Sequence, residues 1–214
     1  MGRLTLASII VLATALNAQL PIRTQLFYAD LPSGGSITAT AVDSSGNLFA
    51  LGTYSGRNGF VAKINPDFQV EFIATIPTDM VQANAIALDQ FNNVYVTGST
   101  NRIWDVAIQP SVIGCEGYCS SDAFLVKVDG KTGNVAWVTY FGGQFDDSGT
   151  GVAVQANGEI YVTGTTFSPD FPVTDGARIP AKPPLTFGSL SEPFGFVARI
   201  SADGKKWFLA VSRG

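Results

Sequence analysis

NVYVTGST spans Asn93–Thr100 and EIYVTGTT spans Glu159–Thr166, and a weaker copy of the same phrase, NLFALGTY, spans Asn47–Tyr54. An apolar stretch and a short polar turn come before each copy. The turns hold residues that tolerate a positive backbone φ, as tight turns between antiparallel strands require; these are Ser45-Gly46-Asn47, Asn92-Asn93 and Asn157-Gly158. The three passages therefore predict three β-hairpins, each with a second strand that ends in Gly-Thr or Gly-Ser.

Two more segments follow each hairpin in the same order. The first has a Phe, two apolar residues and then a base, as in GFVAKI, AFLVKV and GFVARI at 59–64, 123–128 and 195–200. The second comes after a turn and is rich in aromatic residues, as in VEFIATI, VAWVTYF and WFLAV at 70–76, 135–141 and 207–211. Each unit is therefore predicted to contain four short strands, joined in sequence as a meander.

A single four-stranded sheet cannot bury both of its faces. Several such sheets stacked around an axis bury both faces of each, and this architecture is the β-propeller. The spacing between units varies because only the connection between the second and third strands grows, as repeat architectures allow. A β-sandwich holds as many strands, but it does not predict a recurring phrase. We predict an all-β fold, a partial β-propeller with three four-stranded antiparallel blades visible.

The predicted organisation is a signal peptide at 1–18, a lead-in at 19–36, and blades at 37–80, 81–143 and 144–214. The lead-in contains TQLFYADLPSGG, at 24–35, which resembles an outer strand such as AWVTYFGG later in the chain. A ring uses a lone outer strand at the N-terminus to complete its last blade. Because closed propellers have about four to eight blades, we expect further blades of the same chain or ring.

The N-terminus, MGRLTLASIIVLATALNA, has the features of a secretory signal peptide. Arg3 is followed by an apolar run from Leu4 to Leu16 and by small residues. Cleavage is expected after Ala18, and Ala13-Thr14-Ala15 offers a competing site. The run is short for a membrane span, and a buried core helix is the other interpretation. We predict an exported protein with no stable membrane span after cleavage, secreted or at the cell surface, with the periplasm as an alternative.

Composition argues against several function classes. The chain has 17 acidic and 13 basic residues and no basic block, so the electrostatic footprint of a nucleic-acid-binding protein is missing. None of its 214 residues is histidine, which removes Ser-His-Asp and Cys-His arrangements and the commonest zinc ligand. Carboxylate, lysine or tyrosine chemistry stays open. We therefore expect a protein that is not an enzyme.

The run YFGGQFDDSGTGVAVQANGEIYVTGTTFSPDFPVTDGA, at Tyr140–Ala177, resembles the bacterial β-propeller repeat family called SBBP. DAFLVKVDGKTG, at Asp122–Gly133, resembles the family's next strand and turn. The first unit is looser, because VTG has become ALG at Ala50–Gly52. The resemblance covers most of residues 37–211. It implies a propeller module of an exported or surface-attached bacterial protein, and it implies neither catalytic residues nor a cofactor.

Two cysteines, Cys115 and Cys119, lie in the segment GCEGYCSS. An oxidising compartment permits a disulfide between them, which would close a tight local loop. Free thiols are the alternative, and a metal site needs more ligands than this pair supplies. We predict a disulfide that pins this loop.

Two other groups of polar residues have both a structural and a functional interpretation. Asp146 and Asp147 are adjacent acids beside a glycine-rich turn, where they either cap the turn or bind calcium. Lys63, Lys127 and Arg199 recur at one place in every unit. They either lie solvated or snorkelling on an outer strand face or bind an anionic ligand near a central channel.

Trp137 ends DGKTGNVAW, which also resembles the tryptophan-docking repeats of quinone-dependent dehydrogenase propellers, with Phe72 and Trp207 at the equivalent positions. Core packing is the other interpretation. Two long loops, at 101–121 and 180–194, join the same two strands of their units and should emerge at one end. We predict an extracellular scaffold or binding module for a protein or glycan partner. The alternative is a propeller enzyme, or a quinone- or cofactor-binding propeller, whose site lies in blades missing from this chain.

Overall fold

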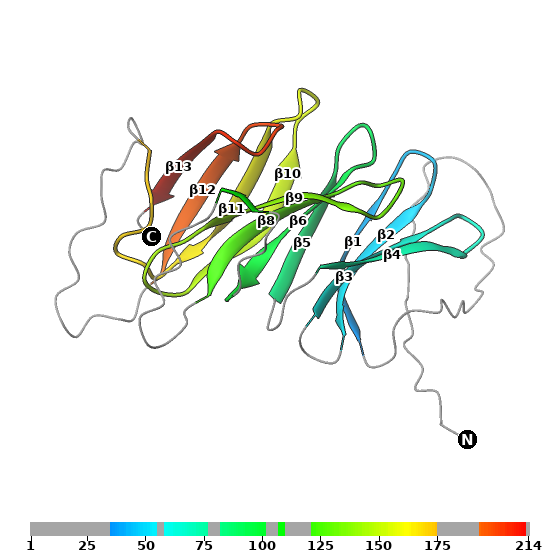
Figure 1. Ribbon diagram of the computed structural model, residues 1–214, viewed down its shortest axis with the longest axis horizontal. Coiled ribbons are helices and arrows are strands. Elements are labelled where there is room, and N and C mark those ends of the chain that lie inside the picture. The colour runs from blue at the N-terminus through cyan, green and yellow to red at the C-terminus, as the bar shows by residue number, and fades with distance from the viewer. Residues whose placement is uncertain are drawn as a thin grey trace, which may run out of the picture.

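The computed structural model describes residues 35–54, 58–76, 82–101, 107–109, 121–174 and 193–212. These residues form β-strands in three sheets and contain no helix (Figure 1). Accordingly, no helix able to cross a membrane occurs in this part of the chain. The predicted signal peptide, the lead-in strand up to residue 34 and the cysteine pair Cys115 and Cys119 lie outside the described residues.

Each sheet is a meander of strands in chain order. Blade I contains β1 (Ser36–Val42), β2 (Leu48–Tyr54), β3 (Asn58–Ile64) and β4 (Val70–Ile76). Blade II contains β5 (Gln82–Leu88), β6 (Val94–Thr100), β8 (Asp122–Val128) and β9 (Val135–Phe141), with β7 (Ala107–Gln109) added at the edge of β9. Blade III contains β10 (Asp147–Val154), β11 (Ile160–Thr166), β12 (Phe194–Ile200) and β13 (Trp207–Ser212). The predicted four-stranded antiparallel meander is confirmed, whereas β7, which runs parallel to β9, was not predicted.

The three sheets stand side by side in chain order (Figure 1). They approach one another most closely at their first strands, where β1 lies beside β5 and β5 lies beside β10. The later strands of neighbouring sheets lie farther apart, so the sheets spread outward from the inner edge that the first strands form. This is the arrangement of propeller blades, and the prediction of a partial β-propeller is confirmed.

Each blade has two different faces. We call the face toward the next blade in the chain its leading face and the opposite face its trailing face. The junction of blades I and II is a core made by the leading face of blade I with the trailing face of blade II. Its main side chains are Phe49, Leu51, Val61, Ala74 and Phe72 from blade I, and Val94, Val96, Phe124, Val126, Val138 and Tyr140 from blade II.

The junction of blades II and III repeats this packing one blade later. Its main side chains are Tyr95, Leu125, Trp137 and Phe141 from the leading face of blade II, and Ile160, Val162, Phe196, Ala198, Ile200 and Leu209 from the trailing face of blade III. Since strand side chains alternate between faces, each phrase such as VYV supplies side chains to both junctions. Burial of this apolar surface is the main force that holds neighbouring blades together.

The glycine in each copy of the phrase has a structural cause. The first strand of every blade has a β-bulge opposite it, between Ile37 and Ala39 in blade I and at equivalent places in the others. A Cβ atom on Gly98 would overlap the backbone carbonyl of Gln82, and the equivalent glycines of the other blades meet the same backbone group. The bulged strand therefore approaches too closely for any side chain, and this explains why the phrase keeps its glycine.

The hairpin turns follow the predicted chemistry. Gly46 and Gly158 have φ values of 84° and 85°, and Asn92 has a φ of 65°. In blade I the carboxylate of Asp43 accepts hydrogen bonds from the backbone N–H groups of Ser45 and Asn47, both at 2.9 Å. Asp89 does the same in blade II. The three predicted turns with a residue at positive φ are thus confirmed.

Candidate functional site

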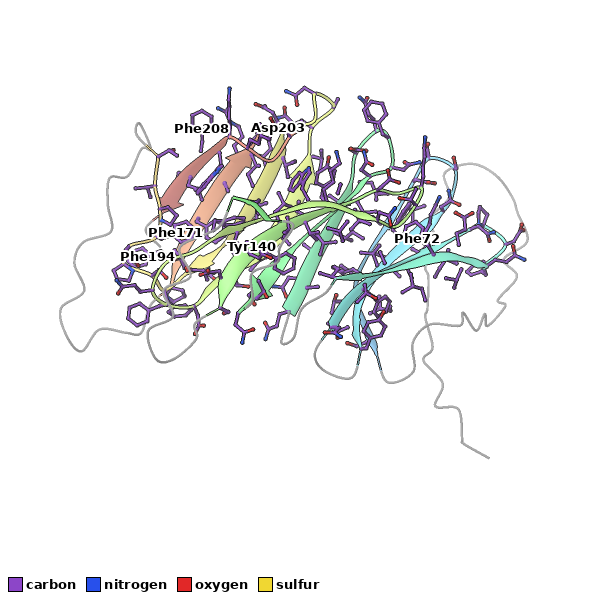
Figure 2. All side chains as sticks on the ribbon, viewed as in Figure 1. Phe72, Tyr140, Phe171, Phe194, Asp203 and Phe208 are labelled. Carbon is purple, nitrogen blue, oxygen red and sulfur yellow. The ribbon has the colours of Figure 1, made fainter. Side chains whose placement is uncertain are left out.

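The insertions of blades II and III emerge at the same end of the propeller. In blade II the chain leaves after β6, which ends at Thr100, and returns at Asp122, its partner in the ladder. In blade III it leaves after Thr166 and returns at Phe194, the equivalent pair. Phe171 and Phe194 lie at this end of blade III, and Asp203, in the turn between β12 and β13, lies at the other end (Figure 2). The loops around this end form the candidate site.

Asp147, at the start of β10, is the central group of this site and is only 1% exposed. Its Oδ2 atom accepts hydrogen bonds from the N–H of Gly143 and from the hydroxyl of Ser168, both at 2.8 Å. Burial raises the pKa of this carboxyl to about 6, and the nearby Asp170 carboxylate adds to the rise, although the hydrogen bonds to Asp147 oppose it. Asp147 therefore changes its charge close to neutral pH.

A second buried carboxylate lies next to Asp147. Asp122, at the start of β8, is also 1% exposed, and a Cβ atom on Gly142 would touch the carboxyl groups of both Asp122 and Asp147. Gly142 thus leaves the space in which the two acids, one from blade II and one from blade III, come together. Among the residues that the structure describes, no group of three or more Asp, Glu, Cys or His side chains lies close enough to hold a metal ion.

Asp146 joins the start of β8 to the start of β10. Its Oδ1 atom accepts hydrogen bonds from the backbone N–H of Ser121 at 2.9 Å and from the Ser121 hydroxyl at 3.0 Å. The N–H of Asp147 in turn donates to the backbone carbonyl of Ser121 at 2.6 Å. The two adjacent aspartates therefore have different roles. Asp146 fixes the end of the blade II insertion, and Asp147 is buried beneath it.

The loop after β11 completes the network. The hydroxyl of Ser168 accepts a hydrogen bond from the N–H of Phe145 at 2.9 Å, and the carboxylate of Asp170 accepts one from the N–H of Gln144, also at 2.9 Å. Phe171 follows, and its ring stacks on Phe196 with 4.9 Å between centroids. The loop that begins the blade III insertion is thus tied by polar bonds to the start of β10 and by an aromatic contact to the junction core.

Ser168→Ala is expected to lower the free energy of unfolding by about 1.5 kcal/mol, because Asp147 loses a buried hydrogen-bond donor. Urea denaturation at pH 7 measures the change. Ser45→Ala is the matched control, since Ser45 lies in an exposed turn and donates only through its backbone; we expect less than about 0.5 kcal/mol there. Equal effects at the two serines would contradict a special role for Ser168.

Residues 73–102 and 136–172 match the family model of the SBBP beta-propeller repeat. The chain thus contains two SBBP repeat segments. No curated protein matches it. Both matched segments begin in the fourth strand of one blade's meander, β4 or β9, and end after the second strand of the next blade, so the SBBP repeat crosses a blade junction. The segment at 136–172 contains Gly142, Asp146, Asp147, Ser168 and Phe171, so it holds most of the network described above, whereas Ser121 and Asp122 lie outside it.

The basic residue of each unit lies over an aromatic ring. Lys63 Nζ is 5.7 Å from the centroid of Phe49, Lys127 Nζ is 5.3 Å from that of Tyr95, and the guanidinium of Arg199 is 4.5 Å from that of Phe208. All three lie on the third strand of their blades and not at the inner edge. The choice between a solvated or snorkelling base and an anion-binding base stays a prediction. A cation over a ring is stabilising, so the bases support the blade faces.

Trp137 is 8% exposed in the junction core of blades II and III, where it meets Tyr95 edge to face at 6.2 Å. Trp137 therefore packs in the core of the part of the chain that the structure describes. The expected equivalence with Trp207 is wrong. Lys127 pairs with Trp137, and Arg199 pairs with Phe208, so Phe208 is the equivalent residue. Trp207 pairs with Ile200, as Val135 pairs with Val128, and a register shift between β8 and β9 then places Trp137 opposite Lys127.

The two SBBP insertions also share a feature that the sequence-based prediction missed. In blade II, β7 pairs with β9. In blade III, Thr174 follows the repeated phrase at about the distance that separates β7 from the phrase of blade II. It lies beside β13, where its N–H donates to the carbonyl of Leu209 at 3.2 Å. Each insertion therefore covers the outer edge of its own blade, which protects that edge from pairing with other chains. The signal was the stretch AIQ at 107–109 in one unit and PVT at 172–174 in the other, which begin at nearly the same distance after Thr100 and Thr166.

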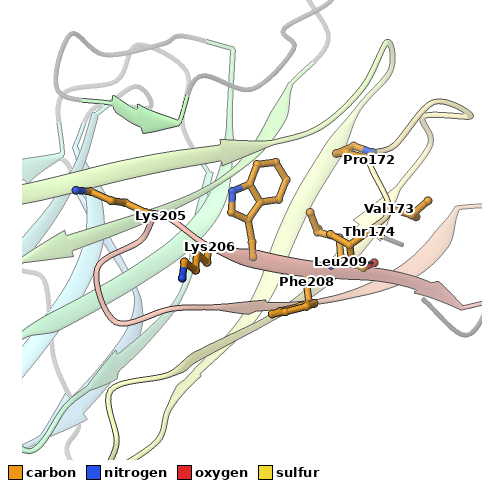
Figure 3. A pocket seen from close by; sticks show the side chains of 8 residues that line it. Pro172, Val173, Thr174, Lys205, Lys206, Phe208 and Leu209 are labelled. Carbon is orange, nitrogen blue, oxygen red and sulfur yellow. Dashed lines mark hydrogen bonds between the residues drawn. The ribbon is translucent and has the colours of Figure 1, made fainter. Parts of the chain in front are cut away.

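An open groove of about 510 Å³ lies along this covered edge of blade III. Pro172, Val173 and Thr174 line one side, and the start of β13 lines the other, including Trp207, Phe208 and Leu209. Lys205 and Lys206 lie at one end (Figure 3). The groove thus combines an apolar floor with two positive charges, next to the point where the insertion leaves the blade.

Proposed function

We propose that this SBBP protein is an exported, non-enzymatic scaffold, which presents the insertions of blades II and III to a protein or glycan partner outside the cell. The observation that carries the proposal is that both insertions leave at the same end of the propeller, each between the second and third strands of its blade. A rigid frame that carries variable loops at one end is a common design of binding proteins.

The anchoring of the insertions supports this proposal. The blade II insertion ends at Ser121, which Asp146 holds through two hydrogen bonds. The blade III insertion begins at Ser168 and pairs with β13 through Thr174. These bonds fix the described roots of both loops, and a loop with fixed ends loses less conformational entropy when it binds a ligand.

The binding role is tested by exchanging loops. Residues 175–192 are replaced by residues 55–57, which join the same two strands in blade I, and a second variant replaces residues 110–120 by a glycine-serine linker of the same length, so that β7 stays beside β9. The probe is a microarray of bacterial and plant polysaccharides, incubated with labelled protein. We expect binding to a subset of glycans, and loss of binding when an insertion is removed while the free energy of unfolding stays within about 1 kcal/mol.

Glycan binding that survives both replacements would place the ligand elsewhere on the propeller and overturn the proposal. Export is tested separately, by N-terminal sequencing of the protein recovered from the periplasm or the medium. We expect a mature chain that begins at Gln19, the residue after the predicted cleavage site. Recovery only from the cytoplasm, with Met1 or Gly2 still in place, would contradict the exported location.

A further inference from the structure

Thr174 covers the edge of β13 at Leu209, but the start of this strand is open. The N–H of Leu209 donates to the hydroxyl of Thr174, and its carbonyl accepts from the N–H of Thr174, each at 3.2 Å. Both groups of Leu209 therefore point away from β12. Backbone groups alternate in direction along an antiparallel strand, so Trp207, two residues earlier, also turns its N–H and carbonyl outward. Within the described ranges, no hydrogen bond reaches the backbone of Trp207 from this side.

The open edge lies in the groove at blade III, and the walls of this groove suit the side chains of a peptide. Pro172 and Val173 belong to one wall, and Trp207 and Phe208 belong to the other (Figure 3). All four are apolar, and each is at least partly accessible. A strand edge with free donors and acceptors recognises an extended peptide by strand addition, in which main-chain bonds give affinity and neighbouring apolar surfaces select side chains.

Two positive charges at one end of the groove define the chemistry of the occupant. Lys205 and Lys206 are the only adjacent bases in a chain of net charge −4, and both are exposed. In the part of the chain that the structure describes, the ion pair is Lys63–Glu71, and neither Lys205 nor Lys206 takes part in one. Asp203 in the same turn accepts a hydrogen bond from the N–H of Lys205 at 3.1 Å. An acidic ligand is therefore attracted to this end of the groove.

A second copy of this chain is a poor occupant of the same edge. It would bring its own two ammonium groups to the contact, and like charges on paired strands are destabilising. An anionic glycan would satisfy the two lysines, but it does not offer N–H and carbonyl groups at the spacing of a strand. The open backbone of Trp207 therefore favours a peptide over both alternatives.

We propose that this groove binds a short extended peptide of a partner protein, which pairs with the backbone of Trp207 and places acidic side chains against Lys205 and Lys206. The inference goes beyond the presentation of the insertions. The site lies on the edge of blade III, and every residue that forms it belongs to the described part of the chain.

The probe is a fluorescein-labelled peptide of about six residues, the length of a short strand, in which glutamate alternates with valine. Its binding to the full chain is followed by fluorescence anisotropy. We expect saturable binding, which weakens about tenfold when lysine replaces glutamate in the peptide. A peptide of the same sequence with methylated amide nitrogens keeps its charges but cannot donate to a strand edge. We expect it to bind about tenfold more weakly as well.

The lysines are tested by the double variant Lys205→Glu, Lys206→Glu, which is expected to weaken the binding of the glutamate peptide about tenfold. Lys131→Glu is the matched control. Lys131 is exposed and follows Asp-Gly in the turn between the third and fourth strands of blade II, as Lys205 does in blade III. We expect Lys131→Glu to leave the affinity unchanged.

The position of the peptide is tested by amide exchange with solvent, measured by NMR. Saturating peptide is expected to slow the exchange of the Trp207 N–H about tenfold or more, because an open donor becomes hydrogen-bonded. The N–H of Phe208, which faces β12, is the control and should keep its rate.

The proposal is overturned if the glutamate peptide does not bind, or if Lys131→Glu weakens binding as much as the double variant. It is also overturned if binding survives methylation and leaves the exchange of Trp207 unchanged, since charge alone would then explain it, as for an anionic glycan. Binding that appears only when residues 175–192 are replaced by residues 55–57 would overturn it too, because the insertion of the same chain would then be the occupant.

Discussion

Gly98→Ala is expected to lower the free energy of unfolding by about 4 kcal/mol, a large part of the stability of a domain of this size. The new Cβ atom would overlap the backbone carbonyl of Gln82. A backbone group inside a sheet cannot rotate away as a side chain can. The substitution therefore either changes the bulge between Ala83 and Ala85 or breaks hydrogen bonds between β5 and β6. Urea denaturation followed by the fluorescence of the buried Trp137 measures the loss.

Gly151→Ala is the matched control for this prediction. Gly151 also lies in a bulged first strand, but a Cβ atom there meets only the hydroxyl oxygen of Thr163, at 2.7 Å. Thr163 is exposed and can change its rotamer, so we expect a loss below about 1 kcal/mol. If Gly98→Ala were as mild as Gly151→Ala, close approach of the bulged strand would not be the reason for the glycine in the phrase.

The stability of the protein is expected to fall by about 3 kcal/mol as the pH rises from 3.8 to about 6, as a result of Asp147 alone. The folded state raises the pKa of this carboxyl from 3.8 to about 6, so between these values the folded protein binds a proton that the unfolded chain has lost. The contribution is therefore fully present below pH 3.8, declines through this window and is absent above it. Asp43, Asp129 and Asp203 have lowered pKa values. They change the stability of the protein only at pH values below 3.8, outside the range in which Asp147 acts.

Asp147→Asn isolates this effect. The amide keeps an acceptor for Gly143 and Ser168 but does not titrate, so we expect the decline between pH 3.8 and about 6 to disappear from its urea denaturation series. The exposed neighbour Asp146 provides the control, and Asp146→Asn should keep the slope of the parent protein. A slope that survives in Asp147→Asn would assign the pH dependence to another group.

Much of the fold follows from local sequence. The predicted strands at 70–76 and 135–141 match β4 and β9 at every residue, because both are long apolar runs between strong turn signals. The turns at Gly46 and Asn92 were also predictable, since a positive φ limits the choice of residue. These features depend on a few neighbouring residues, so a single sequence is enough to reveal them.

The missed features depend on contacts that are distant in sequence. β7 has only three residues and pairs through its backbone, so the stretch AIQ is too short to mark a strand without comparison with the other blade. The equivalence of Trp137 and Phe208 depends on a register shift in one hairpin that the other lacks. The adjacent acids Asp146 and Asp147 suggested one shared role, but they differ in burial. Asp147 is enclosed by the loop at Ser168, whereas Asp146 is exposed. Which of two neighbouring polar residues becomes buried is decided here by the loop after β11 and by the preceding blade.

The difference between leading and trailing faces has a consequence for how such a gene can change. In the vocabulary of subunit assembly these junctions are heterologous, since two unlike surfaces meet and the same contact recurs at each step. After a blade is duplicated, deleted or exchanged by recombination, each junction still joins a leading face to a trailing face. The neighbouring blades can therefore pack as they did before. Length variation is meanwhile confined to the connection between the second and third strands, away from the inner edge where the blades come closest. Copy number and loop content can therefore vary independently of each other, without redesign of the junctions.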